Sequence, residues 1–345
     1  MIKNRRHSCF LRAIASAFCF LNAVFLFSQD IHFSNWNMSP LNVNSANAGM
    51  FDGDGRLIFN YRNQWKTVKV PYNTLSFGGD FNLKKSLVKG TEEAVGIILN
   101  HDVAGDGNYQ ITDVKIPINH KLSFIKDTSL TVAIGVMPGI TSIGINSNNL
   151  SYDKQWDGDA YNQGLSNGEN FVRQSKIFAD VSLGTVIQKQ INQKIKVNVG
   201  YSLNHLNKPN ISFYNTPGVV LRPRHMEQVQ VQFSFNNISS IMLEYYAQQQ
   251  QAFKENLVGL SYYYTIDPKT KTILNAGVLS RLGDAFITTV GLQFNNIRLQ
   301  ASYDYNYSQF KKATNGRGAF EISLIYIYAR PKLFVPKTRV CPVYM

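Results

Sequence analysis

Apolar and polar residues alternate along most of the chain with the two-residue period of a β-strand. In residues 296–306, the odd positions hold Ile, Leu, Ala and two Tyr, whereas the even positions hold Asn, Arg, Gln, Ser and Asp. Residues 228–236 repeat the pattern, with Val and Phe on one face and Gln, Ser and Asn on the other. Such alternation predicts strands that have one apolar and one polar face.

The pattern predicts fourteen strands, many of about the length that a tilted strand needs to cross a membrane. An even number is expected of a single-chain bacterial barrel whose two ends lie on one side of the membrane. The fourteen runs are 55–65, 72–83, 93–102, 109–125, 128–141, 171–190, 193–206, 225–236, 238–247, 254–265, 271–281, 284–294, 296–306 and 317–329.

The links between these runs differ in length on the two sides of the predicted sheet. On one side the link 84–92 is the longest, and the other links are short: 126–127, 190–192, 237, 267–270 and 295. The other side includes a tight link at 282–283 and longer ones at 142–170, 207–224, 247–253 and 307–316. Short periplasmic turns and longer outer loops are typical of outer-membrane barrels.

A soluble β-sandwich would also alternate, so the two folds are separated by other features. The polar faces hold much uncharged Gln, Asn and Ser, as a wet lumen would, and Tyr and Phe recur near strand ends. A charged side chain on the lipid-facing side would cost about 2–4 kcal/mol at mid-membrane, and the apolar faces carry none. We therefore expect an all-β, antiparallel transmembrane β-barrel of about fourteen strands, and a soluble surface adhesin is the weaker alternative.

The first 28 residues resemble a cleaved signal peptide, because a basic start precedes an apolar run too short to span a bilayer. The chain then divides into residues 29–54, a periplasmic or plug segment; 55–329, the outer-membrane β-barrel; and 330–345, a basic periplasmic tail. A fourteen-strand lumen is wide. We expect it to be partly occluded, by residues 29–54 or by the 142–170 loop.

Removing the signal segment, which has four basic and no acidic residues, lowers the formal net charge from +13 to +9. The basic residues are scattered rather than clustered, which argues against nucleic-acid binding. Only Cys341 remains after cleavage, so no internal disulfide or cysteine metal cluster is possible. The tail is basic enough to suit an acidic periplasmic partner through Arg330, Lys332, Lys337 and Arg339.

Catalytic and metal-binding patterns are weak. The Asp-Gly pairs near residues 52–55 lack the ligand spacing of a calcium loop, and the histidines lack zinc spacing. We therefore expect no enzyme activity, cofactor or metal. The polar residues predicted to face the lumen bind a plug or substrate, or pair with one another: Glu244, Arg298, Asp304, Asn306 and Glu321.

Several segments, in the right order along the chain, resemble the PorP/SprF family of outer-membrane proteins of type IX secretion and gliding in Bacteroidetes. They are the entry segment 32–49, the strand element 61–65, the second strand 71–80, the closing hairpin and Cys341-Pro342. The residues that carry the resemblance are His32, Phe33, Ser34, Pro40, Asn44, Gly49, Tyr61, Arg62, Gln64, Trp65, Pro71, Tyr72 and Glu321. The chain departs from the family at Ser45, where the family has Pro, and at the residues that follow Pro342.

The resemblance implies a non-enzymatic outer-membrane protein, surrounded by lipid, that assists export or surface retention of specific cargo such as an adhesin. It also implies contact with other type IX components. An outer-membrane channel for small molecules is the alternative from another class.

Overall fold

A computed structural model describes residues 30–65, 71–83, 91–124, 127–146, 150–169, 174–309 and 311–330. The expected signal peptide (1–28), residues 331–345 of the tail and Cys341 lie outside the described residues.

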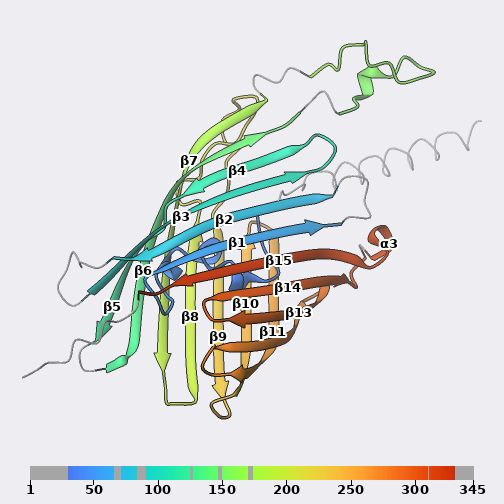
Figure 1. Ribbon diagram of the computed structural model, residues 1–345. Coiled ribbons are helices and arrows are strands. Elements are labelled where there is room, and N and C mark those ends of the chain that lie inside the picture. The colour runs from blue at the N-terminus through green and yellow to red at the C-terminus, as the bar shows by residue number, and fades with distance from the viewer. Residues whose placement is uncertain are drawn as a thin grey trace, which may run out of the picture.

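The described strands form one antiparallel sheet that closes on itself, because β1 pairs with both β2 and β15 (Figure 1). The first seven strands are β1 (Gly55–Gln64), β2 (Tyr72–Asn82), β3 (Thr91–Ala104), β4 (Tyr109–Lys115), β5 (Ile118–Phe124), β6 (Asp127–Gly144) and β7 (Ser175–Gln190). The others are β8 (Ile195–Asn204), β9 (Arg224–Ser234), β10 (Ser239–Gln250), β11 (Phe253–Asp267), β12 (Thr272–Arg281), β13 (Ala285–Phe294), β14 (Ile297–Asn306) and β15 (Arg317–Tyr328).

The barrel has fourteen crossings, although its described strands are numbered to fifteen. Strands β4 and β5 are two halves of one crossing, since both pair with β3 on one side and β6 on the other. Pro117 lies at the break, where it cannot donate a ladder hydrogen bond, and its carbonyl accepts from Gly96 N at 2.8 Å. The fourteen-strand barrel predicted from the sequence is confirmed.

The two faces of the sheet are reversed relative to a soluble protein. Outward positions are apolar and exposed, as at Leu57, Phe59 and Leu299, whereas inward positions are polar and buried, as at Asn60 and Ser302. An apolar outer belt around a polar interior suits lipid outside and a polar lumen inside. No helix among the described residues is long and apolar enough to cross a membrane.

The two ends of the barrel differ, and we name them by their links. The turn rim holds the start of β1, the end of β15 and the short turns 191–194, 235–238, 268–271 and 295–296. The loop rim holds the long links 145–174 and 205–223 and the link 307–316, which contains α3 (Lys311–Thr314). The expected long loop at 247–253 is wrong, because β10 and β11 continue to a two-residue turn whose Gln251 has a φ of +53°.

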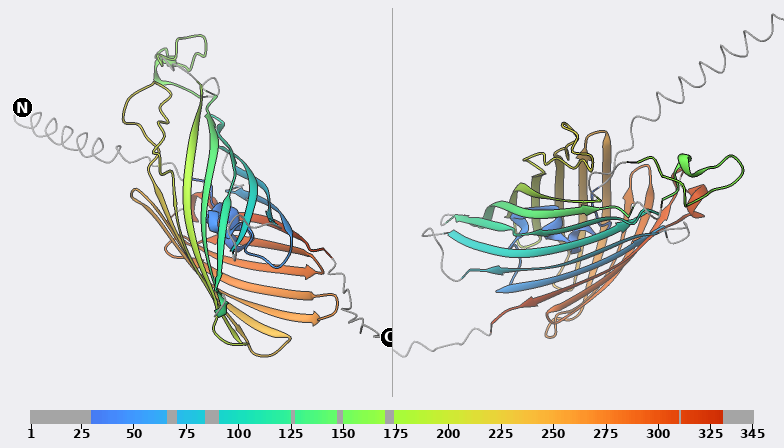
Figure 2. Two further views of the ribbon diagram at one scale, coloured as in Figure 1. Left: turned by 90° about the vertical axis from the view of Figure 1, so that its left-hand side faces the viewer. Right: turned by 90° about the horizontal axis from the view of Figure 1, so that it is seen from above.

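Residues 30–54, which we call the plug segment, lie inside the lumen (Figures 1 and 2). They form three short helical turns, η1 (Trp36–Met38), α2 (Pro40–Val43) and η2 (Ser45–Asn47). The hydrophobic core lies between plug and wall: Met38 and Leu41 pack with residues that include Ile58 and Ile325. The described part of the 142–170 loop does not occlude the lumen. Residues 150–169 are mostly exposed and project away from the barrel (Figure 1).

Candidate functional site: the plugged lumen

The plug segment is anchored to the wall by a carboxylate from the closing strand. Glu321 on β15 accepts from the backbone N–H groups of Ser34, at 2.7 Å, and Asn35, at 2.9 Å. The same carboxylate pairs with Arg62 on β1, and both side chains are almost completely buried. Each oxygen of Glu321 therefore holds one plug amide, which fixes the height of the plug in the barrel.

The Ser34 hydroxyl is shared among three charged side chains of the wall. It donates to Asp304 Oδ2 at 2.7 Å and accepts from Arg62 and from Arg281. Arg281 also pairs with Asp304 at 3.1 Å and with Glu255 at 3.2 Å. Charges this deeply buried are tolerated only when paired and hydrogen-bonded, and the plug hydroxyl completes that pairing. We call Ser34, Arg62, Arg281, Asp304 and Glu321 the anchor cluster.

The end of the plug nearest the loop rim is held by Asp30 and His205. His205 Nε2 lies 2.5 Å from Asp30 Oδ2, and its Nδ1 lies 2.9 Å from Asp180 Oδ2. Burial opposes both charges, but Arg224 and His205 hold the pKa of Asp30 well below its usual value. Burial also opposes protonation of His205, but Asp30 and Asp180 outweigh it and raise its pKa. The contact is therefore an ion pair below neutral pH.

The neighbouring His32 behaves differently. Its Nε2 lies 3.8 Å from Glu255. Burial lowers the pKa of His32, and the nearby Arg62 and Arg281 oppose its protonation further. His32 is therefore neutral at physiological pH.

Three glycines on adjacent strands form a cradle for the middle of the plug. A Cβ atom at Gly135 on β6 would lie 2.5 Å from the Ala46 nitrogen, and one at Gly184 on β7 would lie 1.9 Å from Asn44 Oδ1. Gly200 on β8 lies beside the same Asn44 side chain. The plug forms hydrogen bonds with the wall backbone beside these glycines. Asn44 Nδ2 donates to the carbonyls of Thr185 and Tyr201, and Ser45 Oγ donates to that of Gly135.

At the turn rim the plug is held by a second buried ion pair. Asp80 on β2 accepts two hydrogen bonds from Arg56, at 2.9 and 2.8 Å, and one from Gly49 N at 2.7 Å. Gly49 has a φ of +72°, a conformation that glycine adopts without strain. Lys121 Nζ donates to the Gly49 carbonyl at 3.1 Å. The plug is thus fastened at both rims and in the middle.

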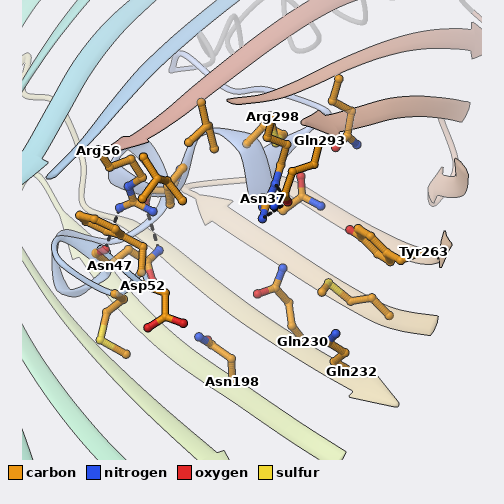
Figure 3. A pocket seen from close by; sticks show the side chains of 18 of the residues that line it. Asn37, Asn47, Asp52, Arg56, Asn198, Gln230, Gln232, Tyr263, Gln293 and Arg298 are labelled. Atoms are coloured by element: carbon orange, nitrogen blue, oxygen red, sulfur yellow. Dashed lines mark hydrogen bonds between the residues drawn. The ribbon is translucent and has the colours of Figure 1, made fainter. Parts of the chain in front are cut away.

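A polar cavity of about 440 Å³ remains between the plug and the wall on the turn-rim side (Figure 3). We call it the vestibule. Its floor includes Asn37 of the plug, and its wall carries Gln230, Gln232, Tyr263 and Arg298 (Figure 3). A smaller cavity of about 220 Å³ lies at the loop rim. The described residues contain no group of three or more His, Cys, Asp or Glu side chains suited to a metal ion.

The structure places the polar residues expected in the lumen as follows. Asp304 and Glu321 are in the anchor cluster, and they both bind the plug and pair with arginines. Glu244 is 4% exposed and accepts from Asn37 Nδ2 at 2.9 Å. Asn306 is buried beside Thr314 at the loop rim. Arg298 donates to Gln293 and has no carboxylate partner among the described residues.

The residues that carry the family resemblance gather in two places. His32, Arg62, Gln64, Trp65 and Tyr72 line the loop-rim cavity, where the Trp65 and Tyr72 rings meet edge to face at 5.1 Å. Along the plug, Phe33 is buried, Pro40 opens α2, and Ser34, Asn44 and Gly49 make the wall contacts given above. Tyr61 points outward, and Pro71 directly precedes β2.

Several residues that fasten the plug are not indicated by the sequence. Arg56, Asp80, Glu255 and Arg281 are inward charges on strands, and the alternation places them on the polar face without showing their partners. The glycine cradle has no sequence signal, because its three glycines lie on different strands and other strand glycines, such as Gly139 and Gly144, do not contact the plug. A search for inward charges of opposite sign could have found the anchor cluster only once the pairing of the strands in the closed barrel was known.

A family model described as type IX secretion system membrane protein PorP/SprF matches residues 25–326. The chain belongs to the PorP/SprF family. The resemblance inferred from the sequence is confirmed, and so is the outer-membrane localisation. A PorP/SprF protein is a component of type IX secretion, from a secretion-system family rather than an enzyme family.

Solved structures that resemble this PorP/SprF chain include channels and porins. The CymD monoaromatic hydrocarbon channel is 10% identical, with 88% of this chain and 95% of that chain covered and a TM-score of 0.49. A mutant of the TodX monoaromatic hydrocarbon channel is 9% identical over 83% of this chain and 92% of its own, with a TM-score of 0.47. A mutant porin of Rh. blastica is 9% identical over 79% and 98%, with a TM-score of 0.33. A comparison with curated proteins found no match.

In an outer-membrane barrel the short turns face the periplasm and the longer loops face the cell exterior. The turn rim of this PorP/SprF protein is therefore its periplasmic end, and the loop rim faces the cell exterior. The vestibule accordingly opens toward the periplasm.

Proposed function

We propose that this PorP/SprF protein is a closed, non-enzymatic partner of the type IX machinery that assists export or surface retention of a specific cargo protein. The observation that supports this proposal most strongly is the plug. A barrel whose own N-terminal segment is hydrogen-bonded to buried ion pairs of its wall suits a docking protein better than a diffusion pore.

The absence of enzyme activity is part of the proposal. The buried charged groups of the anchor cluster are occupied by one another and by the plug. A catalytic acid or nucleophile needs access to substrate, and these side chains are fully buried.

The external side is proposed to meet the cargo. Residues 150–169 extend beyond the loop rim and expose Trp156, Tyr161 and Leu165. An acidic and aromatic loop of this kind offers both apolar area and charge to a protein partner. Adhesins and other gliding-type surface proteins of Bacteroidetes are the proposed class of cargo.

The periplasmic side is proposed to meet other components of the secretion apparatus. The tail that begins at Arg330 contains Lys332, Lys337 and Arg339 and no acidic side chain. A basic segment at the periplasmic end suits an acidic partner.

Gene deletion tests the secretion role against the channel alternative. The proteins at the cell surface and in the medium are compared between wild type, deletion strain and a strain complemented with the intact gene. The proposal expects loss of one or a few surface proteins and recovery on complementation. An unchanged set of secreted proteins, together with impaired uptake of small nutrients, would favour the channel and overturn the proposal.

A further inference from the structure

We propose that the vestibule binds an extended, acidic polypeptide segment that enters from the periplasm. The inference deepens the proposed function and rests on it, because it gives the chemistry of a periplasmic partner. It depends on the position, the charge and the hydrogen-bonding groups of the vestibule.

The vestibule has its mouth at the turn rim, and the plug lies across its inner end. Lys271, Asn295 and Asn296 of the turn rim line its mouth, and Trp36 and Asn37 of the plug form its floor. Beyond the floor lies the anchor cluster, whose buried charged side chains are paired with one another. A ligand therefore enters from the periplasm and stops at the plug.

The vestibule has an excess of positive charge. Lys196, Lys271 and Arg298 line it, and within the described part of the chain none of the three has a carboxylate partner. Arg56 also lines it but is neutralised by Asp80. The acidic groups on this side are Asp52, which is exposed, and Glu244, which lies behind Asn37.

This arrangement differs from the rest of the lumen, where each arginine of the anchor cluster has a carboxylate at bonding distance. Lys196 and Arg298 are half-buried whereas Lys271 is exposed at the mouth, and half-buried unpaired cations attract anions more strongly than cations in open water do. The missing partners of these cations are therefore expected to come from the ligand.

The second property of the vestibule is its capacity to form hydrogen bonds with a peptide backbone, through free amide side chains on neighbouring strands. The strand pairing places Gln188, Asn198 and Gln230 in one row across β7, β8 and β9, and Gln232 beside Lys196 in the next row. Among the described residues, Gln188, Gln230 and Gln232 have no protein partner for their amide groups. Each amide offers donors and an acceptor, as the backbone of an extended peptide requires.

The spacing of these amides also fits a peptide. Gln230 and Gln232 are two residues apart on one strand, a rise of about 6.8 Å, which is also the repeat of one side of an extended polypeptide. Both side chains point into the vestibule (Figure 3).

A sugar is a poorer fit, because sugars are usually held against an open aromatic face. Three rings line the vestibule, and two are occupied: Trp36 stacks on Tyr246 at 5.6 Å, and Phe51 lies under the Arg56 guanidinium. The chain's own tail is a poorer fit as well, because residues 331–345 are basic and have no acidic side chain.

Binding is tested with the purified full-length protein in detergent micelles. The probe is a fluorescent peptide of about twelve residues that alternates Asp with Ser and Thr, and the comparison peptide has Asn in place of Asp. We expect the acidic peptide alone to bind. Arg298→Gln and Lys271→Gln should each weaken binding about tenfold, as expected when one charge-assisted hydrogen bond is lost.

Lys269→Gln is the matched control for Lys271→Gln. Lys269 lies in the same turn and is exposed, but it does not line the vestibule, so this variant should bind as the wild type does. Equal binding of the Asn peptide, or equal weakening by Lys269→Gln, would overturn the proposal. All variants should keep the heat-dependent gel migration of a folded barrel.

A second experiment identifies the partner in cells. A photocrosslinking amino acid is placed at Gln232, which faces the vestibule, and at the neighbouring Val231 as a control. We expect a protein adduct from position 232 that disappears in the Arg298→Gln, Lys271→Gln double variant. An adduct with polysaccharide, with the chain's own tail, or one that survives in the double variant would contradict the inference.

The two proposals fail separately. If the acidic peptide binds but gene deletion leaves secretion unchanged, the site stands and the secretion role is wrong. If deletion abolishes secretion of a cargo but no acidic peptide binds, only the inference fails.

Discussion

Glu321 and Glu244 are both buried glutamates that face the plug, yet their surroundings differ. Glu321 accepts from two backbone amides and from Arg62, so both of its carboxylate oxygens are hydrogen-bonded and its charge is paired. Glu244 accepts from Asn37 Nδ2 with one oxygen, while its Oε2 and the Asn37 Oδ1 have no donor within the described part of the chain. The same side chain is therefore an anchor at one position and a destabilising buried charge at the other.

The first prediction follows from this contrast. Glu321→Gln should weaken plug docking by about 3–5 kcal/mol, because it leaves the Arg62 charge without its closest carboxylate. Glu244→Gln should be neutral or stabilising, because its new amide can donate to Asn37 Oδ1. Hydrogen exchange of residues 34–38 measures both effects. Equal loss of protection in the two variants would contradict the argument.

The second prediction concerns pH at the external end of the plug. His205 has a raised pKa, so its stabilising ion pair with Asp30 is complete below about 6.5 and is lost as the pH rises through that raised value. Asp30 has a lowered pKa and loses its charge only in strong acid. Asp180, Arg224 and Lys115 are the other charges near this pair.

A spin label at Ile31 should therefore become more mobile as the pH rises above about 6.5 and through the raised pKa of His205. His205→Gln removes the titrating group and should abolish the pH dependence. A label that stays equally mobile over this range in the wild type would show that the ion pair does not hold the plug.

At the scale of elements, the strands were predictable, and residues 29–54 were one of two segments expected to occlude the lumen, but the internal structure of the plug was not predictable. A strand in a barrel has lipid on one face and polar groups on the other, so its sequence alternates and its limits can be read to within a few residues. The plug contacts wall residues all around, so its apolar positions follow no period, and its short helical turns were not anticipated. The break at Pro117 was also missed, because the apolar pattern continues on both sides of it.

The links were partly predictable. Long polar stretches at 142–170 and 207–224 are loops, whereas residues 247–253 extend two strands instead. The Gln-rich end of β10 reads as a loop, but its Gln248 and Gln250 face the lumen and bond to Glu255 and the Arg222 carbonyl. Contacts of these side chains with other strands set the boundary of β10, and the local sequence does not reveal those contacts.

The third prediction concerns the glycine cradle. Gly135→Ala should displace η2 from the wall, because its Cβ would lie 2.5 Å from plug backbone that cannot rotate away. Gly144→Ala, on the same strand β6, meets no atom closer than 3.7 Å and is the control. Limited proteolysis within residues 44–48 should increase for the first variant alone. Increased cleavage in both variants would point to the strand rather than the cradle.

At the scale of the molecule, the barrel wall and its plug form one folded unit. The buried apolar side chains are shared between them, and inward charges such as Arg56, Asp80, Arg281 and Asp304 have plug atoms or one another as partners. A lumen of fourteen strands would otherwise be intermediate between a filled barrel and an aqueous channel.

The fourth prediction is that the plug seals this lumen. The full-length protein should show no large, steady conductance in planar bilayers, and deletion of residues 31–50 should produce one. Deletion of residues 150–169, a segment of the same length in the exposed loop, should leave the bilayer closed. A steady open pore in the intact protein would mean that the vestibule connects to the exterior.

The height at which Asp30 lies has a consequence for biogenesis. Asp30 contacts His205 at the external rim, whereas β1 starts at the periplasmic rim, so the plug runs through the full depth of the lumen. It is exported first, yet Ser34 bonds to Glu321, which is 287 residues later and in the last strand to be made. The wall therefore has to close around a segment already within it. We predict that the cleavage after residue 28 expected from the sequence precedes closure, because Asp30 lies at the external rim once the wall has closed.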